Sequence, residues 1–254
     1  MAEHVAVSVQ DRILTIRMNR PEKKNAVTQE MYRIMMEALR QAQADAAVRV
    51  VLITGSEQCF TAGNDLEDFL KAKPGETSHA LLFLEALATA QKPMVAAVSG
   101  VAVGLGTTML LHCDLVYASS TARFQLPFVN LGISPEAGSS YILPAMVGQR
   151  RAAELLLLGD PFSAETARDL GIVNEVLPEG EVLSRATARA QQLAEKPPAA
   201  LRNARALMKK GSEAAIAEAM ARELKEFGPL LVGPEAKEAF TAFLQRRKPD
   251  FSRF

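Results

Sequence analysis

The first eighteen residues carry apolar side chains at every second position over two stretches. Val5, Val7 and Val9 open this pattern, residues 10–12 interrupt it, and it resumes over residues 13–18. A period of two matches the alternation of side chains along a strand, so the pattern predicts a β-hairpin. Farther along the chain, short and nearly continuous apolar runs predict strands that are buried on both faces. These runs lie at residues 48–54, 93–98 and 115–117.

Segments with helical spacing separate these strands. Thr28 has the side chain of a helix N-cap, and apolar residues then recur every three or four positions. Helices are predicted over residues 28–44, 78–90 and 107–112. The alternation of strands and helices predicts an α/β fold. Residues 71–77, which include Pro74 and Gly75, are the best candidate for a mobile loop.

The chain changes character at residue 198. Strand patterns end there, and the remaining residues are rich in Ala, Glu, Lys and Arg. We therefore expect a core at residues 1–197 and a helical C-terminal region at residues 198–254. The apolar positions of that region form a stripe: Leu201, Leu207, Met208, Ile216, Met220, Leu224 and Phe227. A helical tail this small has too little surface of its own to cover the stripe, so we expect contacts with other subunits.

Composition narrows the possible functions. The chain has 29 Lys and Arg against 29 Asp and Glu, so its charge provides no general attraction for nucleic acid. Cys59 and Cys113 stand apart from each other and from any Cys/His cluster, which argues against a metal site and a disulfide framework. The N-terminus lacks the pattern of a signal peptide, and no apolar run is long enough to span a bilayer. We therefore expect a cytoplasmic protein that binds neither nucleic acid nor membranes.

Small residues cluster after the first buried strand. Thr61, Ala62 and Gly63 would let a ligand approach the backbone closely, and glycine also permits unusual backbone angles. Asn64 and Asp65 each have a side chain that can cap the helix that follows. The segment is thus either a ligand-binding turn or an ordinary capped turn between a strand and a helix.

A second glycine-rich turn follows the strand at residues 93–98. Its backbone N–H groups, around Gly104 and Gly106, would lie at a helix N-terminus, where the helix dipole favours negative charge. The spacing resembles a dinucleotide-binding fingerprint, but Met109 occupies the position of the third glycine. Anion binding and a plain strand-to-helix turn therefore both remain open for this segment.

Glu136 has unusual surroundings for a carboxylate. It lies in the run ISPEAG at residues 133–138, and carboxylates seldom occur among such apolar and small residues. Burial would raise its pKa and make it a candidate general base; the alternative is a carboxylate at a helix N-terminus. The histidines lie in separate motifs and are expected to be structural or surface residues, and no G-x-S-x-G nucleophile motif is present.

A series of short motifs occurs along nearly the whole chain. They are NRPEKKNA at residues 19–26, FTAGNDL at 60–66, KP at 92–93, GVAVGLG at 100–106, CDLVYA at 113–118, ARDLGIV at 167–173 and RRKPDF at 246–251. In this order they resemble the enoyl-CoA hydratase/isomerase (crotonase) family. The resemblance implies a spiral of ββα units followed by a helical C-terminal region that makes homotrimer contacts, often within a dimer of trimers.

The same resemblance implies an acyl-CoA thioester as substrate and assigns residues to its binding. The backbone N–H groups of Asn64 and Leu105 would form the catalytic oxyanion hole for the thioester oxygen. The substrate-binding positions that the resemblance implies are Lys24, Ala26, Ala62, Gly63, Asn64, Asp65, Leu66, Gly104, Leu105, Thr108 and Phe128. A basic run such as residues 246–248 is usually a solvated helix end; the resemblance implies the alternative that a neighbouring subunit uses it to help hold phosphate. No cofactor is implied, because coenzyme A is part of the substrate.

Departures from the family pattern point to the reaction. Hydratases of the family position the attacking water with two glutamates, which fall at Thr108 and Phe128 of this chain. Glu136 instead resembles the catalytic glutamate of the Δ3,Δ2-enoyl-CoA isomerases, and GNDL at residues 63–66 also resembles that branch. We therefore expect an isomerase of fatty acid β-oxidation that moves a double bond from position 3 to position 2, with Glu136 as its base. The alternatives are a hydratase, another crotonase-type reaction, and an acyl-CoA binder or RNA-associated relative without catalysis.

Overall fold

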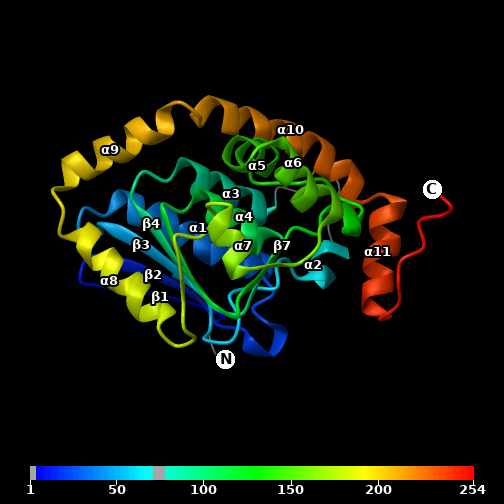
Figure 1. The fold of residues 1–254 in the computed structure, drawn as a ribbon, viewed down its shortest axis with the longest axis horizontal. Helices are drawn as coiled ribbons and strands as arrows, with labels where there is room; N and C mark the ends of the chain where they lie inside the picture. Colours follow the sequence, from blue (N-terminus) through cyan, green and yellow to red (C-terminus); the bar gives the residue numbers. More distant parts are fainter. Residues whose placement is uncertain (1–3, 71–77) are drawn as a thin grey trace.

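A sheet of six strands forms the centre of the structure, which is a computed structural model describing residues 4–70 and 78–254. The strand order is β1-β2-β3-β4-β6-β9; β1 runs antiparallel to β2, and the other neighbouring pairs are parallel. The strands are β1 (Val5–Gln10), β2 (Ile13–Met18), β3 (Val50–Thr54), β4 (Met94–Val98), β6 (Leu115–Ser119) and β9 (Glu175–Leu177). The predicted hairpin and the predicted buried strands are thereby confirmed (Figure 1).

Helices cover both faces of this sheet, which explains why its central strands are almost continuously apolar. The covering helices are α8 (Val182–Ala194) on one face, and α1 (Gln29–Ala44) with α3 (His79–Thr89) packed beside it on the other. Along β3, Val50 and Leu52 pack with α8, whereas Val51 and Ile53 belong to the core on the α1 side. A single strand therefore contributes alternate side chains to both hydrophobic cores.

A second, smaller sheet carries the segment on which the candidate site is built. Its order is β5-β7-β8, and its strands are β5 (Val101–Val103), β7 (Arg123–Gln125) and β8 (Phe162–Ser163). β5 leads directly toward α4 (Leu105–Thr108), which continues as the 3-10 helix η2 (Met109–His112). The helix expected over residues 107–112 therefore begins two residues earlier than predicted and tightens into a 3-10 helix in its second half.

Shorter helical elements surround this core. They are η1 (Pro21–Lys23), α2 (Leu66–Leu70), η3 (Val129–Leu131), α5 (Ser139–Val147), α6 (Gln149–Ala153), the π-helical turn η4 (Glu154–Leu158) and α7 (Ala164–Asp169). The mobile loop that the sequence predicts at residues 71–77 lies outside the described residues. Within the described ranges, no helix combines the length and the apolar composition needed to cross a membrane.

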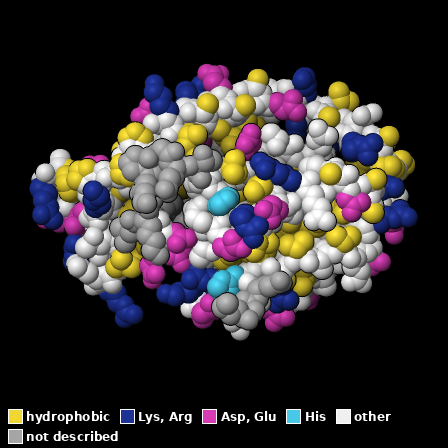
Figure 2. Space-filling view, turned by 180° about the vertical axis from the view of Figure 1, so that it is seen from behind, with side chains coloured by type: hydrophobic (Ala, Val, Ile, Leu, Met, Phe, Trp, Pro, Cys, Tyr) yellow, Lys and Arg dark blue, Asp and Glu magenta, His cyan; other side chains and the backbone are white. Residues whose placement is uncertain are grey.

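Helices also form the end of the chain. They are α9 (Pro198–Lys210), α10 (Glu213–Leu231) and α11 (Pro234–Leu244). In Figure 1, α9 and α10 arch over the rest of the molecule, with α10 passing over α5. A helical C-terminal region is thus confirmed, while a division into two domains at residue 198 stays a prediction. The opposite face, shown in Figure 2, intermixes Lys and Arg with Asp and Glu, so that face carries no large field of one sign.

Candidate active site

Two extended segments that lie side by side bring Asn64 and Leu105 together. Thr61 forms a parallel bridge with Ala102 of β5, and the Val103 N–H donates a hydrogen bond to the Thr61 carbonyl oxygen at 3.0 Å. Asn64 and Leu105 each follow a bridge residue by three positions. Within the part of the chain that the structure describes, neither the Asn64 N–H nor the Leu105 N–H has a hydrogen-bond acceptor, and both residues line the same cavity. Two backbone donors are therefore available to a ligand there.

Glycine residues allow these segments to approach each other. Gly63 has a φ of +89°, and a Cβ atom at this position would lie 2.7 Å from the Val103 carbonyl oxygen. Gly104 has a φ of 55° and a ψ of −116°, a combination that residues with a Cβ atom rarely adopt. A side chain at Gly63 would push the two segments apart, and one at Gly104 would strain the turn that aims the Leu105 N–H.

Tyr32 of α1 holds the side chain of Asn64. Its hydroxyl donates to Asn64 Oδ1 at 2.5 Å, and its ring is fully buried, with a centroid 5.7 Å from that of Phe83. Burial and the nearby Glu136 carboxylate raise the pKa of Tyr32 well above its ordinary value. The phenol therefore keeps its proton and remains a hydrogen-bond donor to Asn64.

Glu136 enters the same cavity from the loop that precedes α5. Ala137 and Gly138 have φ angles of 60° and 73°, which turn the chain sharply after Glu136. The Thr108 hydroxyl of α4 donates to Glu136 Oε1, and His112 Nε2 hydrogen-bonds the Ala137 carbonyl oxygen at 2.8 Å. These hydrogen bonds hold the loop against α4 and η2. Helix α4 begins at Leu105, whose backbone N–H has no acceptor among the described residues.

Burial raises the pKa of Glu136 from 4.5 to about 8. Desolvation is the largest cause; the hydrogen bond from Thr108 lowers the pKa, and the carboxylate of Glu223 raises it further. The side chain is half-buried because it faces the cavity. Glu136 is therefore poorly hydrated and yet accessible to a ligand, which suits a group that exchanges protons near neutral pH.

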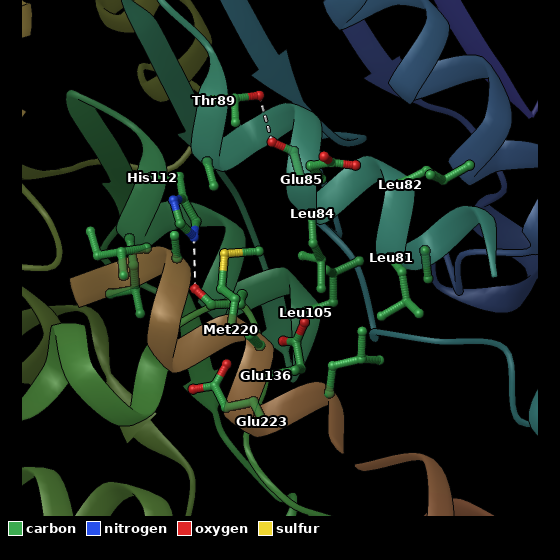
Figure 3. Close-up of a pocket in the computed structure, with 18 of the residues that line it drawn as sticks. Leu81, Leu82, Leu84, Glu85, Thr89, Leu105, His112, Glu136, Met220 and Glu223 are labelled. Carbon is green, nitrogen blue, oxygen red and sulfur yellow. Dashed lines mark hydrogen bonds between the residues drawn. The ribbon is translucent and has the colours of Figure 1, made fainter. Parts of the chain in front are cut away.

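The cavity lies between α3 and α10 and has a volume of about 2060 Å³. Figure 3 shows Glu136 and Leu105 on its wall, with leucines of α3 on one side and Met220 of α10 on another. Much of its apolar lining comes from these two helices: Leu81, Leu82, Leu84, Ile216, Met220, Leu224 and Phe227. Such walls suit a hydrocarbon chain, and the volume leaves room for an extended one.

The structure brings together some of the residues predicted from the sequence and separates others. Asn64, Leu105 and Glu136 all line the cavity. Thr108 is fully buried and touches the site through its hydrogen bond to Glu136. Phe128 is 4% exposed and belongs to the hydrophobic core; among the described residues it is not part of the cavity wall. The structure therefore places Phe128 in the core and not among the described residues that line the cavity.

The predicted coenzyme A contacts lie on two segments joined by backbone hydrogen bonds. The Ala62 N–H donates to the Lys24 carbonyl oxygen at 2.9 Å, and the Val27 N–H donates to the Gly63 carbonyl oxygen at 2.8 Å. Lys24 is exposed, while Ala26 and Ala62 are half-buried. These two segments form a rim next to Asn64; in the described ranges, none of their residues other than Asn64 lines the cavity itself.

Asp65 fastens this rim. Its carboxylate accepts a hydrogen bond from Arg20 Nη1 at 2.7 Å and caps α2 through the Glu67 N–H at 2.9 Å, so Asp65 is the one of the two candidate caps that holds this helix. Burial opposes its ionisation, but Arg20 and the backbone donors lower the pKa of Asp65 below its ordinary value. Leu66, the first residue of α2, is half-buried beside it. Asp65 thus holds the rim together through contacts within the protein.

Sequence reasoning did not identify Tyr32 and Glu223, which also line the cavity. Tyr32 occurs on the apolar face of α1, where an aromatic residue is ordinarily part of the core. Glu223 lies three residues after Met220 and four before Phe227, within the apolar stripe of α10, and it is only 6% exposed. A carboxylate at an apolar position of a helical stripe is the sequence signal that points to it.

The basic run near the C-terminus binds a carboxylate of its own chain. Arg247 makes hydrogen bonds of 2.5 and 2.9 Å to the two carboxylate oxygens of Glu238. A contact between this run and phosphate stays a prediction. In residues 4–70 and 78–254, no group of three or more His, Cys, Asp or Glu side chains is arranged to hold a metal ion.

Known proteins are similar to this chain in sequence and in fold. The family model for enoyl-CoA hydratase/isomerase matches residues 8–253. The 2,3-dehydroadipyl-CoA hydratase of Escherichia coli K12 is 35% identical over 249 residues, which cover 96% of this chain and 97% of the relative. Enoyl-CoA delta isomerase 2 of Rattus norvegicus is also 35% identical, over 96% of this chain, but the match spans only 64% of that longer protein. The solved structure of Pseudomonas aeruginosa OdaA is 47% identical and superposes with a TM-score of 0.94 over 96% of this chain and 100% of that one.

The chain therefore belongs to the enoyl-CoA hydratase/isomerase family, within the crotonase superfamily. The fold and family predicted from the sequence are confirmed. Membership implies an enzyme that acts on an acyl-CoA thioester. It does not select the reaction, because relatives named as hydratases and as isomerases are equally similar to this chain.

Proposed function

We propose that the protein is an enoyl-CoA isomerase that moves a double bond from position 3 to position 2, with Glu136 as its proton carrier. The observation that carries this proposal is the location of Glu136, whose carboxyl group faces a cavity also lined by Asn64 and Leu105. The backbone N–H groups of these two residues have no acceptor among the described residues. Thr108 occupies the position where hydratases of the family have a glutamate, and here it donates a hydrogen bond to Glu136. A single mobile proton and a site for negative charge meet the needs of an isomerase.

The reaction moves one proton between two carbons. Glu136 Oε2 takes a proton from C2 of a 3-enoyl thioester, and the electron pair of the broken C–H bond spreads to the thioester oxygen as a dienolate. The N–H groups of Asn64 and Leu105 stabilise that oxygen; one such donor contributes about 3–4 kcal/mol in another enzyme. Glu136 then returns the proton to C4, which leaves the double bond between C2 and C3.

The environment of Glu136 favours both proton transfers. A pKa of about 8 makes its carboxylate a stronger base than an exposed glutamate, and its acid form still gives up a proton near neutral pH. The Thr108 hydroxyl donates to Oε1, and Oε2 has no hydrogen-bond donor among the described residues, which leaves Oε2 available to the substrate. The apolar side chains of Leu84 and Met220 on the cavity wall limit the water that would compete by hydrating the product.

Hydration of a 2-enoyl-CoA is the second candidate function. The Escherichia coli relative named as a hydratase is as similar to this chain as the rat isomerase, and Glu223 provides a second carboxylate in the cavity. Both oxygens of Glu223, however, accept backbone hydrogen bonds, at 2.6 Å from the Gly138 N–H and 2.9 Å from the Ser140 N–H. A carboxylate engaged in this way is poorly placed to activate water, which favours isomerisation.

Two substrates separate these functions. Incubation with 3-hexenoyl-CoA and with 2-hexenoyl-CoA, with isomer and 3-hydroxy product measured separately, should show isomerisation of the former and little hydration of the latter. Glu136→Gln should lower isomerisation by ~10²–10⁴-fold, the usual contribution of general acid–base catalysis, and change acyl-CoA affinity only a few-fold. Thr108→Val, which removes a hydrogen bond but no proton carrier, should cost about tenfold or less. Rapid hydration by the wild type, or a Glu136→Gln variant that keeps most of its rate, would refute the proposal.

The remaining features of the proposal concern binding and assembly. The rim that contains Lys24, Ala26 and residues 62–66 would hold the coenzyme A part of the substrate, with Lys24 facing its phosphates. Subunits would assemble as a homotrimer or a dimer of trimers, since Leu207 and Met208 on α9 are 77% and 83% exposed. We place this enzyme in the cytoplasm and in fatty acid β-oxidation.

A further inference from the structure

Helix α10 packs closely on the loop that carries Glu136. Ile216, Met220 and Glu223 follow one another at spacings of four and three residues, so they lie on one face of α10. Gly138 packs against this face: a Cβ atom on Gly138 would lie 3.1 Å from Ile216 Cγ2 and 3.4 Å from Met220 Cγ. Glu223 completes the face and is 6% exposed. A carboxylate is therefore buried directly against the loop.

The Glu223 carboxylate binds the backbone of this loop with both oxygens. Oε2 accepts the Gly138 N–H at 2.6 Å, and Oε1 accepts the Ser140 N–H at 2.9 Å. These N–H groups lie at the N-terminus of α5, where a helix has no internal acceptors for them. Glu223 thus caps α5 from a distant helix, and only Ala137 separates the capped residues from Glu136.

Glu223 also faces Glu136. Figure 3 shows the two carboxyl groups close to each other on the cavity wall. After burial, the charge of Glu223 is a further cause of the raised pKa of Glu136. The two backbone hydrogen bonds of Glu223 therefore also fix the position of one charge that acts on Glu136.

Other titratable groups face the loop from neighbouring elements. Tyr32 of α1 has a pKa well above its ordinary value, and burial lowers the pKa of His112 in η2 to about 4, so both are neutral between pH 6 and 9. Glu85 of α3 and Lys209 of α9 line the cavity as well; Lys209 donates to the His112 carbonyl oxygen at 3.2 Å. In Figure 3, Glu85 lies farther along the cavity from Glu136 than Glu223 does.

We propose that Glu223 is a positioning residue of the active site: through its two backbone hydrogen bonds it holds the loop of residues 136–140 at the cavity and keeps its own carboxylate on the same cavity wall as Glu136. The proposal rests on the proposed role of Glu136 as the base. Helix α10 then contributes to catalysis through the loop, because α10 carries the carboxylate that orients it.

Two substitutions at Glu223 test the effect of its charge and the effect of its side-chain length. Glu223→Gln removes the charge and replaces one of the two accepting oxygens with an NH2 group. Glu223→Asp keeps the charge and both oxygens but shortens the side chain by one methylene. Glu226→Gln makes the same chemical change as Glu223→Gln at an exposed position of α10. Values of kcat and KM for 3-hexenoyl-CoA would be measured from pH 5.5 to 9.5. The wild-type kcat/KM should rise with pH toward about 8, where Glu136 ionises.

The two Glu223 variants should differ in pH dependence. In Glu223→Gln the rise of kcat/KM should move down by about 0.5–1 pH unit, because the like charge is gone. In Glu223→Asp the rise should stay at the wild-type pH, while kcat falls about 3–30-fold and KM changes less than about 3-fold, because the loop is displaced. Glu226→Gln should match the wild type in both respects.

Each alternative result overturns the proposal. If Glu223→Gln lowers kcat/KM by the same factor at every pH, Glu223 acts only as a helix cap. If Glu223→Asp keeps the wild-type kcat, the position of the loop does not depend on the side-chain length of Glu223. If Glu223→Gln fails to fold, the Glu223→Asp result decides alone. If the wild type shows no isomerisation, the proposed function fails, but 13C NMR titration of the Glu136 carboxyl in wild type and Glu223→Gln still tests the effect of the charge.

Discussion

Replacing Glu136 with Gln should stabilise the protein at high pH while it removes the proposed activity. In the folded protein the pKa of Glu136 is about 8, against an ordinary value of 4.5 that applies to the unfolded chain. Between these values the folded state keeps a proton that the unfolded state has lost, so the free energy of unfolding falls as pH rises. The stabilisation from the bound proton is complete below pH 4.5 and is lost as pH passes about 8.

The size of the effect follows from the two pKa values. They differ by about 3.5, and each pKa unit corresponds to about 1.36 kcal/mol, which sets a ceiling of about 5 kcal/mol. Water that enters the ligand-free cavity raises the effective dielectric constant around Glu136, so we expect about 2–4 kcal/mol. The Glu136→Gln amide has no proton to lose and can still accept the hydrogen bond from Thr108. Its free energy of unfolding should therefore lack this decline.

Urea unfolding at pH 5 and pH 9 measures the difference. Wild type and variant would be compared at one protomer concentration, since the stability of an oligomer depends on it. The free energy of unfolding of Glu136→Gln minus that of wild type should be about 2–4 kcal/mol more positive at pH 9 than at pH 5. For Glu226→Gln, a change at an exposed position of α10, the difference in free energy of unfolding from wild type should not change with pH. If the Glu136→Gln difference is constant within about 0.5 kcal/mol, Glu136 is ionised in the folded protein and the reasoning is refuted.

Two further predictions concern Tyr32 and the assembly. Tyr32→Phe removes the 2.5 Å hydrogen bond to Asn64 Oδ1. The free energy of unfolding in urea should fall by about 1 kcal/mol, and kcat should fall about 3–10-fold with little change in KM. An unchanged kcat would show that the Asn64 N–H is held in place without Tyr32. Light scattering should give a mass of three or six protomers, because Leu207 and Met208 of α9 are largely exposed in the single chain; a stable monomer at micromolar concentration would contradict this.

Local patterns were sufficient to predict the secondary structure that surrounds the site. The apolar run of β3 extends over the whole strand because both of its faces are buried. One face packs against α8, and the other belongs to the core that contains α1. The Thr28 side chain caps α1 by accepting from the Met31 N–H, as its residue type predicts. The helix that the sequence predicts from residue 107 begins at Leu105, because Gly104 and Gly106 resemble a loop in sequence while the chain there already turns into α4.

The sequence by itself determined that this chain has crotonase-type motifs, a carboxylate at Glu136 among small and apolar residues, and no acid at Thr108 or Phe128. These are properties of residue type and order, which do not depend on how distant segments pack.

Tertiary structure decided which groups meet at the site. The bridge between Thr61 and Ala102 places the backbone N–H groups of Asn64 and Leu105 on adjoining segments. Tyr32 donates a hydrogen bond to Asn64, and Glu223 caps α5 from 85 residues away. The helical period shows that Glu223 shares a face with Met220, but it does not show what that face covers. Hydrogen bonds between residues distant in sequence depend on the folded path of the backbone, and a pattern read along the chain contains no information on that path.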